Sequence, residues 1–152
     1  MQIGDANKIS YKTGITTVAD FRLKDMAADG ECAPLAPAFH QQVFHSDNEN
    51  RAVLNIGGIS NLTYLPKDKT QPCFGFDCGP GNILMDAWIQ RHQQQAFDKN
   101  GEWAASTGAD KNLVSQLMSD AFIHQLPPKS TGKEHYHLDW LEQQGNIKQL
   151  DI

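Results

Sequence analysis

The sequence has no apolar run that approaches the ~20 residues needed for a membrane-spanning helix. Its N-terminus also lacks the basic and apolar regions of a secretory signal peptide. Cysteine is scarce, and Cys32, Cys73 and Cys78 are odd in number and show no CxxC spacing, as expected for reduced thiols. The formal net charge of -5 provides no basic surface for nucleic acid or for a membrane. These absences predict a cytoplasmic protein that has neither nucleic acid nor a membrane as a partner.

A phosphate loop of the Walker type is also absent. Residues 127–134 read PPKSTGKE, and their Ser-Thr-Gly-Lys resembles part of such a loop. The full pattern needs glycine at position 127 and serine or threonine at position 134, where this chain has Pro127 and Glu134. The pair His135 and His137 has no third ligand at a suitable spacing, so we expect no metal site made of protein ligands.

Glycine is concentrated in the stretch from Arg51 to Trp88, around which the rest of the chain is organised. Five of the twelve glycines lie here, at positions 57, 58, 75, 79 and 81. The apolar runs 52–56 and 59–65 predict two antiparallel strands, with Gly57-Gly58 as a two-residue turn. Glycines at the tip permit positive φ and leave no Cβ in the way of a ligand, so successive N–H groups can bind a phosphate. The alternative is a tight turn with no ligand.

Asp77 lies at the end of the next predicted strand, 73–77. Gly79-Pro80-Gly81-Asn82 predicts a sharp loop, and Asn82 is a suitable N-cap for a helix from Ile83 to about Arg91. A strand end followed by a helix N-terminus is a common position for catalytic groups and anions in α/β proteins. Asp77 is therefore a candidate catalytic residue. The alternative is a carboxylate that only caps the turn.

Elsewhere the pattern predicts short helices and one further strand. Residues 1–5 resemble the end of a strand and a turn, a helical segment reaches about Tyr11, and the β-branched run 15–19 predicts a strand. The mixed charges of residues 20–25 predict a solvated loop. Three further helices are expected, at 37–44, from Asp110, and at 138–144. The helix from Asp110 is amphipathic.

Several segments together resemble anhydro-N-acetylmuramic acid kinase, a bacterial cell-wall recycling enzyme in the superfamily of sugar kinases, Hsp70 and actin. The segments are TGITTVADFRLKD, APLAPAFH, LNIGGISNLTYL, GFDCGPGNILMDAW and PPKSTGKE. They occur in the family's order and span nearly the whole chain. The combination of NIGGISN with DCGPGN makes the resemblance specific.

The resemblance implies an α/β fold of ribonuclease-H-like (actin-like ATPase) type, present only in part. Residues 1–48 would be the C-terminal part of the first lobe, and residues 49–152 the N-terminal part of the second lobe. The family's Gly-Thr-Ser-x-Asp-Gly phosphate loop and its C-terminal glycine-rich nucleotide motif do not occur in the sequence. We therefore expect a truncated enzyme or one piece of a split enzyme, marginally stable when isolated because unpaired sheet edges remain.

The implied activity is that of an ATP-dependent kinase, which hydrolyses the 1,6-anhydro ring and phosphorylates O6 to give N-acetylmuramate 6-phosphate. Asp77 matches the family's catalytic base. The residues implied for binding the sugar are Asp20, Arg22, Asp25, Gly79 and Asn82. Those implied for binding ATP, with Mg²⁺ bridging its phosphates, are Asn55, Gly57, Gly58, Ser60 and Asn61.

Two function classes remain open at this point. The first is an enzyme, or a catalytic piece of one, whose partners are ATP and an amino sugar. The second is a non-catalytic fragment or interaction module that lacks the flanking motifs. A homodimer, or a complementary chain that supplies those motifs, is an expected partner of the first.

Overall fold

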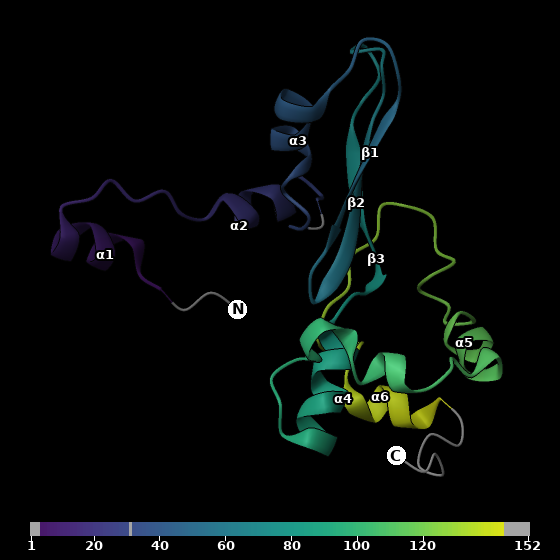
Figure 1. Cartoon of the computed structure of the whole chain (residues 1–152). Coiled ribbons are helices and arrows are strands. Elements are labelled where there is room, and N and C mark those ends of the chain that lie inside the picture. The colour runs from purple at the N-terminus through teal and green to yellow at the C-terminus, as the bar shows by residue number, and fades with distance from the viewer. Residues whose placement is uncertain (1–3, 31, 145–152) are drawn as a thin grey trace. The chain divides into compact units, whose positions relative to one another are not determined.

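The computed structural model describes residues 4–30 and 32–144 (Figure 1). The chain divides into two compact units, residues 1–33 and residues 34–152, and each is described by itself. The helices and the three-stranded sheet make it an α/β protein, as predicted. Among the described residues, no helix is long and apolar enough to cross a membrane. The lobe boundary predicted at residues 48 and 49 stays a prediction.

The first unit contains two short helices. Helix α1 (Ala6–Thr13) begins at Asp5, whose carboxylate accepts hydrogen bonds from the N–H groups of Asn7 and Lys8. It ends at Gly14, whose φ of 67° is the left-handed conformation common at helix C-termini. Of the strand end and turn predicted at residues 1–5, residues 1–3 lie outside the described residues.

The strand predicted at residues 15–19 is wrong, because this segment has no regular structure. Ile15 and Val18 are exposed, so their β-branched side chains have no sheet face to pack against. A β-branched run favours a strand only where such packing is available. The loop predicted at 20–25 is also wrong, since Phe21–Met26 forms helix α2.

The sheet of the second unit consists of β1 (Arg51–Ile56), β2 (Ile59–Leu65) and β3 (Phe74–Pro80), paired antiparallel in that order. The predicted strands 52–56, 59–65 and 73–77 are thus confirmed, but the last continues through Gly79 to Pro80, where a loop was predicted. Strand β1 is an edge of the described sheet.

The turn between β1 and β2 differs from the predicted two-residue turn. Ile56 pairs with Ser60, which leaves three residues between them, and Ile59 already pairs with Pro80 of β3. Neither Gly57 nor Gly58 has a positive φ. Small size, rather than a left-handed backbone, is therefore what glycine contributes at this tip.

The tip of this hairpin packs against the start of helix α4 (Ile83–Gln93). The N–H groups of Gly81 and Ile83 donate to the carbonyl of Gly58 at 2.9 and 3.2 Å, and that of Asn82 donates to Gly57 at 2.9 Å. Because these backbone carbonyls accept their hydrogen bonds, the N–H groups are not available to a side-chain cap or a bound anion. Asn82 occupies the N-cap position as predicted, but its side chain makes no capping hydrogen bond.

Among the remaining helices, one packs on the sheet and one packs on α4. Helix α3 (Pro37–Phe44) has the predicted bounds and packs on β1 and β2, where His40 Nδ1 lies 2.9 Å from Thr63 Oγ1. Helices α5 (Lys111–Leu117) and α6 (Leu138–Gln143) agree with the sequence, although α5 ends before Met118, and both Val114 and Met118 are exposed. Helix α6 packs against α4. Two short 3₁₀ helices lie at Lys99–Gly101 and Ala104–Ser106. Buried apolar side chains of the described residues include Leu65, Ile89, Phe122 and Tyr136.

We predict that Gly81→Ala destabilises the second unit. An alanine Cβ at this position would clash with the Gly57 carbonyl oxygen and lie 2.9 Å from Ser60 Oγ, so the hairpin tip must move away from α4. The expected loss in the free energy of unfolding is about 1–3 kcal/mol, measured by urea denaturation. Gly108→Ala is the matched control, because a Cβ there meets no atom within 4 Å. Equal effects of the two substitutions would contradict the packing described here.

Candidate active site

Asp77 is a buried carboxylate on β3, with 6% of its surface exposed. Its Oδ2 accepts two hydrogen bonds, one from the Ser130 hydroxyl at 3.0 Å and one from the Thr131 N–H at 2.9 Å. Its own backbone N–H donates to the Lys129 carbonyl at 3.1 Å. Residues 129–131 therefore run alongside β3 and hold the carboxylate from one side.

Two asparagines lie in register with Asp77 across the sheet. Asn55 of β1 pairs with Asn61 of β2, and Asn61 pairs with Asp77 of β3. Directly paired residues of neighbouring strands point to the same face of a sheet. The three side chains, which we call the polar row, thus form one line across this face. Polar row residues can present hydrogen-bonding groups and one negative charge to a ligand lying across the strands.

Lys129 anchors the segment that holds Asp77. Its ammonium is buried and donates to the carbonyls of Phe122 and Ile123 at 2.9 and 3.0 Å. It also lies 4.7 Å from the centre of the Phe122 ring and 5.8 Å from that of Phe76. Within the part of the chain that the structure describes, no carboxylate lies in ion-pair range of it. Carbonyl dipoles and aromatic faces instead replace the water that a buried cation loses.

The thiol of Cys78 is not an activated nucleophile. Burial raises its pKa above the ordinary value, the charge of Lys129 offsets this in part, and the charge of Asp77 raises it further. A raised pKa keeps the group as the less reactive thiol at neutral pH. Asp77 is consequently the group on this strand that is suited to acid–base chemistry.

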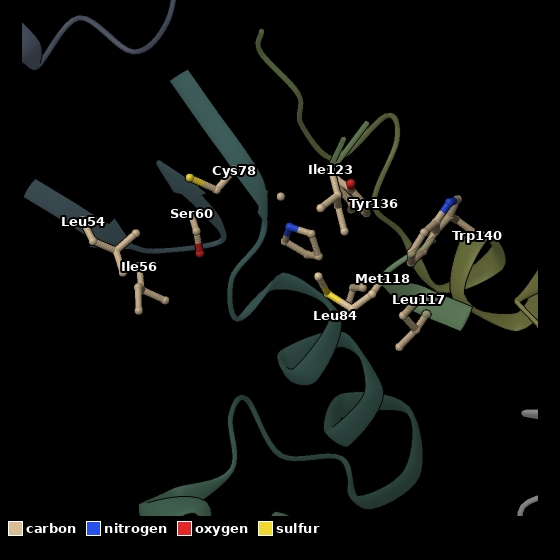
Figure 2. A pocket seen from close by; sticks show the side chains of 12 residues that line it. Leu54, Ile56, Ser60, Cys78, Leu84, Leu117, Met118, Ile123, Tyr136 and Trp140 are labelled. Carbon is tan, nitrogen blue, oxygen red and sulfur yellow. The ribbon is translucent and has the colours of Figure 1, made fainter. Parts of the chain in front are cut away.

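A largely apolar cavity of about 380 Å³ lies on the other face of the hairpin (Figure 2). Leu54 and Ile56 border it from β1, Ser60 from β2, and Cys78 from β3, while Tyr136 and Trp140 border it from the C-terminal part of the unit. Because side chains alternate along a strand, Leu54 and Ile56 point away from the face that carries Asn55. The polar row and this cavity therefore lie on opposite faces.

A second cavity, of about 400 Å³, lies beside the hairpin tip. Gly58, Asn82 and Asp86 border it, as do Lys133 and His137 from the C-terminal part of the unit. An alanine Cβ at Gly58 would meet nothing closer than 3.9 Å, so the backbone at the tip is open to approach. This cavity carries both charge signs and is the more suitable of the two for a polar ligand.

The residues predicted for binding the nucleotide and the sugar fall into separate groups. Gly58 and Asn82 border the second cavity, Ser60 and Gly79 border the first, and Asp77 borders neither. Gly57 contributes its carbonyl to the α4 contact. Asn55 and Asn61 belong to the polar row with Asp77.

Asp20, Arg22 and Asp25 belong to the first unit. Arg22 donates to the carbonyl of Cys32 at 2.6 Å, and Asp25 accepts the N–H of Cys32 at 2.8 Å. Asp20 precedes α2 with a φ of 61°. Two of these three predicted side chains, Arg22 and Asp25, thus bind the backbone of their own unit.

Sequence reasoning missed a cluster formed by Asp120, His135 and Tyr136. Asp120 accepts the Tyr136 hydroxyl at 3.1 Å, and its other oxygen lies 3.2 Å from His135 Nε2. Burial alone would raise the pKa of Asp120, but its hydrogen bonds to His135, to the N–H of Phe122 and to Tyr136 lower the pKa below its ordinary value. Burial and the charge of Asp120 raise the pKa of the Tyr136 hydroxyl strongly. No local pattern signals this cluster, because Asp120 lies 15 and 16 residues before its two partners.

Metal ligands do not gather in the part of the chain that the structure describes. Within residues 4–30 and 32–144 there is no group of three histidines, cysteines or acids that could hold a metal ion. His135 is engaged by Asp120, and the Nδ1 of His137 accepts the N–H of Trp140 at the start of α6.

Comparison with known proteins first identifies the class, because the relatives it finds are kinases. A profile of the anhydro-N-acetylmuramic acid kinase family matches residues 1–151, and the chain therefore belongs to this family. The resemblance stated from the sequence motifs is thus confirmed.

Three curated relatives illustrate the similarity, and all are named anhydro-N-acetylmuramic acid kinase. The protein of Coxiella burnetii (strain RSA 493 / Nine Mile phase I) is 50% identical over 151 residues, which are 99% of this chain and 41% of the relative. That of Shewanella woodyi is 52% identical over 156 residues, 100% of this chain and 42% of the relative. That of Xylella fastidiosa is 54% identical over 143 residues, 94% of this chain and 37% of the relative. The chain spans about two fifths of the length of these relatives.

We predict that the Asp120 cluster stabilises the fold in a pH-dependent way. Because the folded-state pKa of Asp120 is lowered, its carboxylate stabilises the fold above the unfolded pKa of about 4, and this contribution is lost as the pH falls through the folded value. The difference in unfolding free energy between the parent chain and Asp120→Asn should therefore be larger at pH 5 than at pH 3, measured by urea denaturation. Asp139→Asn, at an exposed position, is the control for loss of one surface charge. A difference that does not shrink at pH 3 would show that the carboxylate form of Asp120 is not what stabilises the cluster.

Proposed function

We propose that the full-length protein containing this chain is an ATP-dependent kinase that hydrolyses the 1,6-anhydro ring of anhydro-N-acetylmuramic acid and phosphorylates O6. The product is N-acetylmuramate 6-phosphate, and the process is the recycling of peptidoglycan. The observation that carries the proposal is the buried Asp77, held by residues 129–131 and aligned with two amides, in a chain of this family. The antiparallel sheet supports, as part of the same proposal, a ribonuclease-H-like lobe. No observation favours the alternative of a non-catalytic module.

Asp77 is proposed to act as the general base. Opening the anhydro ring by water requires that a proton leave the water as its oxygen attacks the anomeric carbon. A carboxylate serves this purpose in inverting glycosidases, where it activates a water on one face of the sugar. Asp77 is fixed on a strand and flanked by the amides of the polar row, of which Asn61 is the nearest across the sheet. We infer that the amides of Asn61 and Asn55 orient the water or a phosphate oxygen.

The hairpin tip is proposed to bind the phosphates of ATP. Gly58 is exposed, borders the second cavity and has open space over its Cα. The carbonyls of Gly57 and Gly58 are occupied by α4, and the N–H groups of these two glycines take no part in those hydrogen bonds. The tip thus fits a phosphate, with Ser60 and Asn61 following it in the chain. When bound, ATP supplies the phosphoryl group that O6 receives.

Mg²⁺ is proposed to be held chiefly by the phosphates and by water. Mg²⁺ commonly keeps several waters and few protein ligands, and a cluster of three acidic, histidine or cysteine groups is absent from the described residues. Asp20, Arg22, Asp25, Gly79 and Asn82 remain the proposed contacts to the sugar. The homodimer and the complementary chain expected from the resemblance stay predictions.

Asp77→Asn tests the base directly in a full-length chimera, in which this chain replaces the matching part of the Shewanella woodyi relative. The amide keeps the shape of the side chain but cannot accept the proton. We expect kcat for ring opening to fall by about 10²–10⁴-fold while the Kd for ATP stays within twofold. Ring opening is followed by chromatography of the sugar. A variant with near-normal kcat would refute the assignment of Asp77 as the base.

Gly58→Val tests the nucleotide site in the same chimera. Because an added Cβ at Gly58 meets no atom of the protein closer than 3.9 Å, the fold should tolerate the larger side chain while a phosphate at the tip should not. We expect the KM for ATP to rise about tenfold or more, with an unchanged Kd for the sugar measured by calorimetry. Gly108→Val is the matched control at another open glycine. If both variants keep the parent KM, the phosphates bind elsewhere.

A further inference from the structure

The two oxygens of the Asp77 carboxylate have different surroundings. Oδ2 accepts both the Ser130 hydroxyl and the Thr131 N–H. Within residues 4–30 and 32–144, no donor lies in hydrogen-bond range of Oδ1. Oδ1 is also not fully enclosed. Among these residues, the side-chain polar atom that has neither a hydrogen-bond partner nor contact with solvent is Nε2 of His45, not Oδ1. One oxygen is thus committed to the protein, and the other retains access to a ligand or water.

This asymmetry has a chemical consequence. Each donated hydrogen bond stabilises negative charge on the oxygen that accepts it and occupies one of its lone pairs. Two donors on Oδ2 leave Oδ1 as the oxygen with free lone pairs. They also fix the rotation of the carboxylate about its Cβ–Cγ bond, so that the direction in which Oδ1 points is set before a substrate binds.

The donors are themselves fixed at several points. The carbonyl of Lys129 accepts the Asp77 N–H, which sets residue 130 beside the carboxylate. The Lys129 ammonium is bonded to two carbonyls of the turn at 122 and 123, so the segment cannot slide along β3 without breaking buried hydrogen bonds. Ser130 itself is only half-buried, so the geometry of its hydroxyl depends on this backbone rather than on close packing.

We propose that Ser130 is a positioning residue for the reaction, which it serves by holding Oδ2 so that Oδ1 takes the proton from the attacking water. Lys129 anchors the segment that makes this possible. In the step itself, the water oxygen forms a bond to the anomeric carbon, and the water proton passes to Oδ1. The bond from that carbon to O6 breaks, and its electron pair goes to O6, which forms its new bond to the γ-phosphoryl group that ATP gives up as ADP leaves. The inference rests on the proposed function, because it requires that Asp77 be the base.

The test compares Ser130→Ala with Ser130→Thr in the full-length chimera. Alanine removes the hydroxyl donor and leaves the Thr131 N–H, so the carboxylate gains rotational freedom. We expect kcat for ring opening to fall roughly 10- to 100-fold, which is part of what a general base contributes. The sugar Kd, measured by calorimetry, should stay within twofold. Threonine keeps a hydroxyl at the same atom and should retain most of the parent kcat. Ser119→Ala, which removes a surface hydroxyl bonded only to a local carbonyl, is the control.

The outcomes separate this inference from the proposed function. If Ser130→Ala keeps the kcat of the parent while Asp77→Asn is inactive, the role of Ser130 is overturned and Asp77 remains the base. A lower thermal midpoint with unchanged kcat per folded enzyme would also overturn it, because Ser130 would then serve stability alone. An active Asp77→Asn would refute the base itself. The geometry predicts that kcat falls in Ser130→Ala and is largely retained in Ser130→Thr, while the sugar Kd stays unchanged in both.

Discussion

Two hydrogen bonds to one carboxylate oxygen connect the parts of the second unit that matter most for its chemistry. Ser130 and Thr131 lie 53 and 54 residues beyond Asp77, yet both donate to its Oδ2. Without them the buried carboxylate would lack compensation for the water it loses, at a cost of about 1–3 kcal/mol or more. The rest of the region follows from this constraint. Residue 129 must run beside β3, its ammonium must find buried partners, and the turn at 120–125 provides the carbonyls that bind it.

The hairpin separates two environments. One face presents the polar row of Asn55, Asn61 and Asp77, and the other presents aliphatic side chains to a largely apolar cavity. This division results from the alternation of side chains along three strands in fixed register. Glycines allow other groups to come close to the backbone here. Gly81 lies against the Gly57 carbonyl, and Gly58 leaves the tip open to a ligand. A rigid sheet with a small, open tip is suited to holding a reacting group and a phosphate near one another.

Local elements of the second unit were largely predictable from the sequence. The alternating runs at 52–56 and 59–65 and the proline at the start of 37–44 specify strands and a helix through local sterics and periodicity. The predictions failed where the outcome depended on neighbours. Residues 15–19 have the side chains of a strand but no sheet beside them, and Asn82 is not used as a side-chain cap because carbonyls of the hairpin already accept the N–H groups. The turn was misjudged because the pairing of Ile59 with β3 is a tertiary contact.

The candidate site divides in the same way. The motif around Asp77 was visible in the sequence, and the resemblance to the family gave it a role. That Asn55, Asn61 and Asp77 share one line across the sheet follows only from the register. Residues 129–131 were noted in the sequence as part of an incomplete phosphate loop and of a segment that resembles the family. Their contact with Asp77 required the fold, as did the pairing of Asp120 with His135 and Tyr136. Side chains brought together from distant segments leave no periodic trace in a single sequence.

The central claim is that Oδ1 of Asp77 activates the water that opens the sugar ring. A crystal structure of the full-length chimera with the intact anhydro-sugar and no ATP tests it most directly. The account predicts Ser130 and Thr131 bonded to Oδ2, and a water in hydrogen-bond contact with Oδ1 on the side facing the anomeric carbon. A sugar bound away from Asp77, or an Oδ1 occupied by a protein donor with no water between it and the sugar, would contradict it.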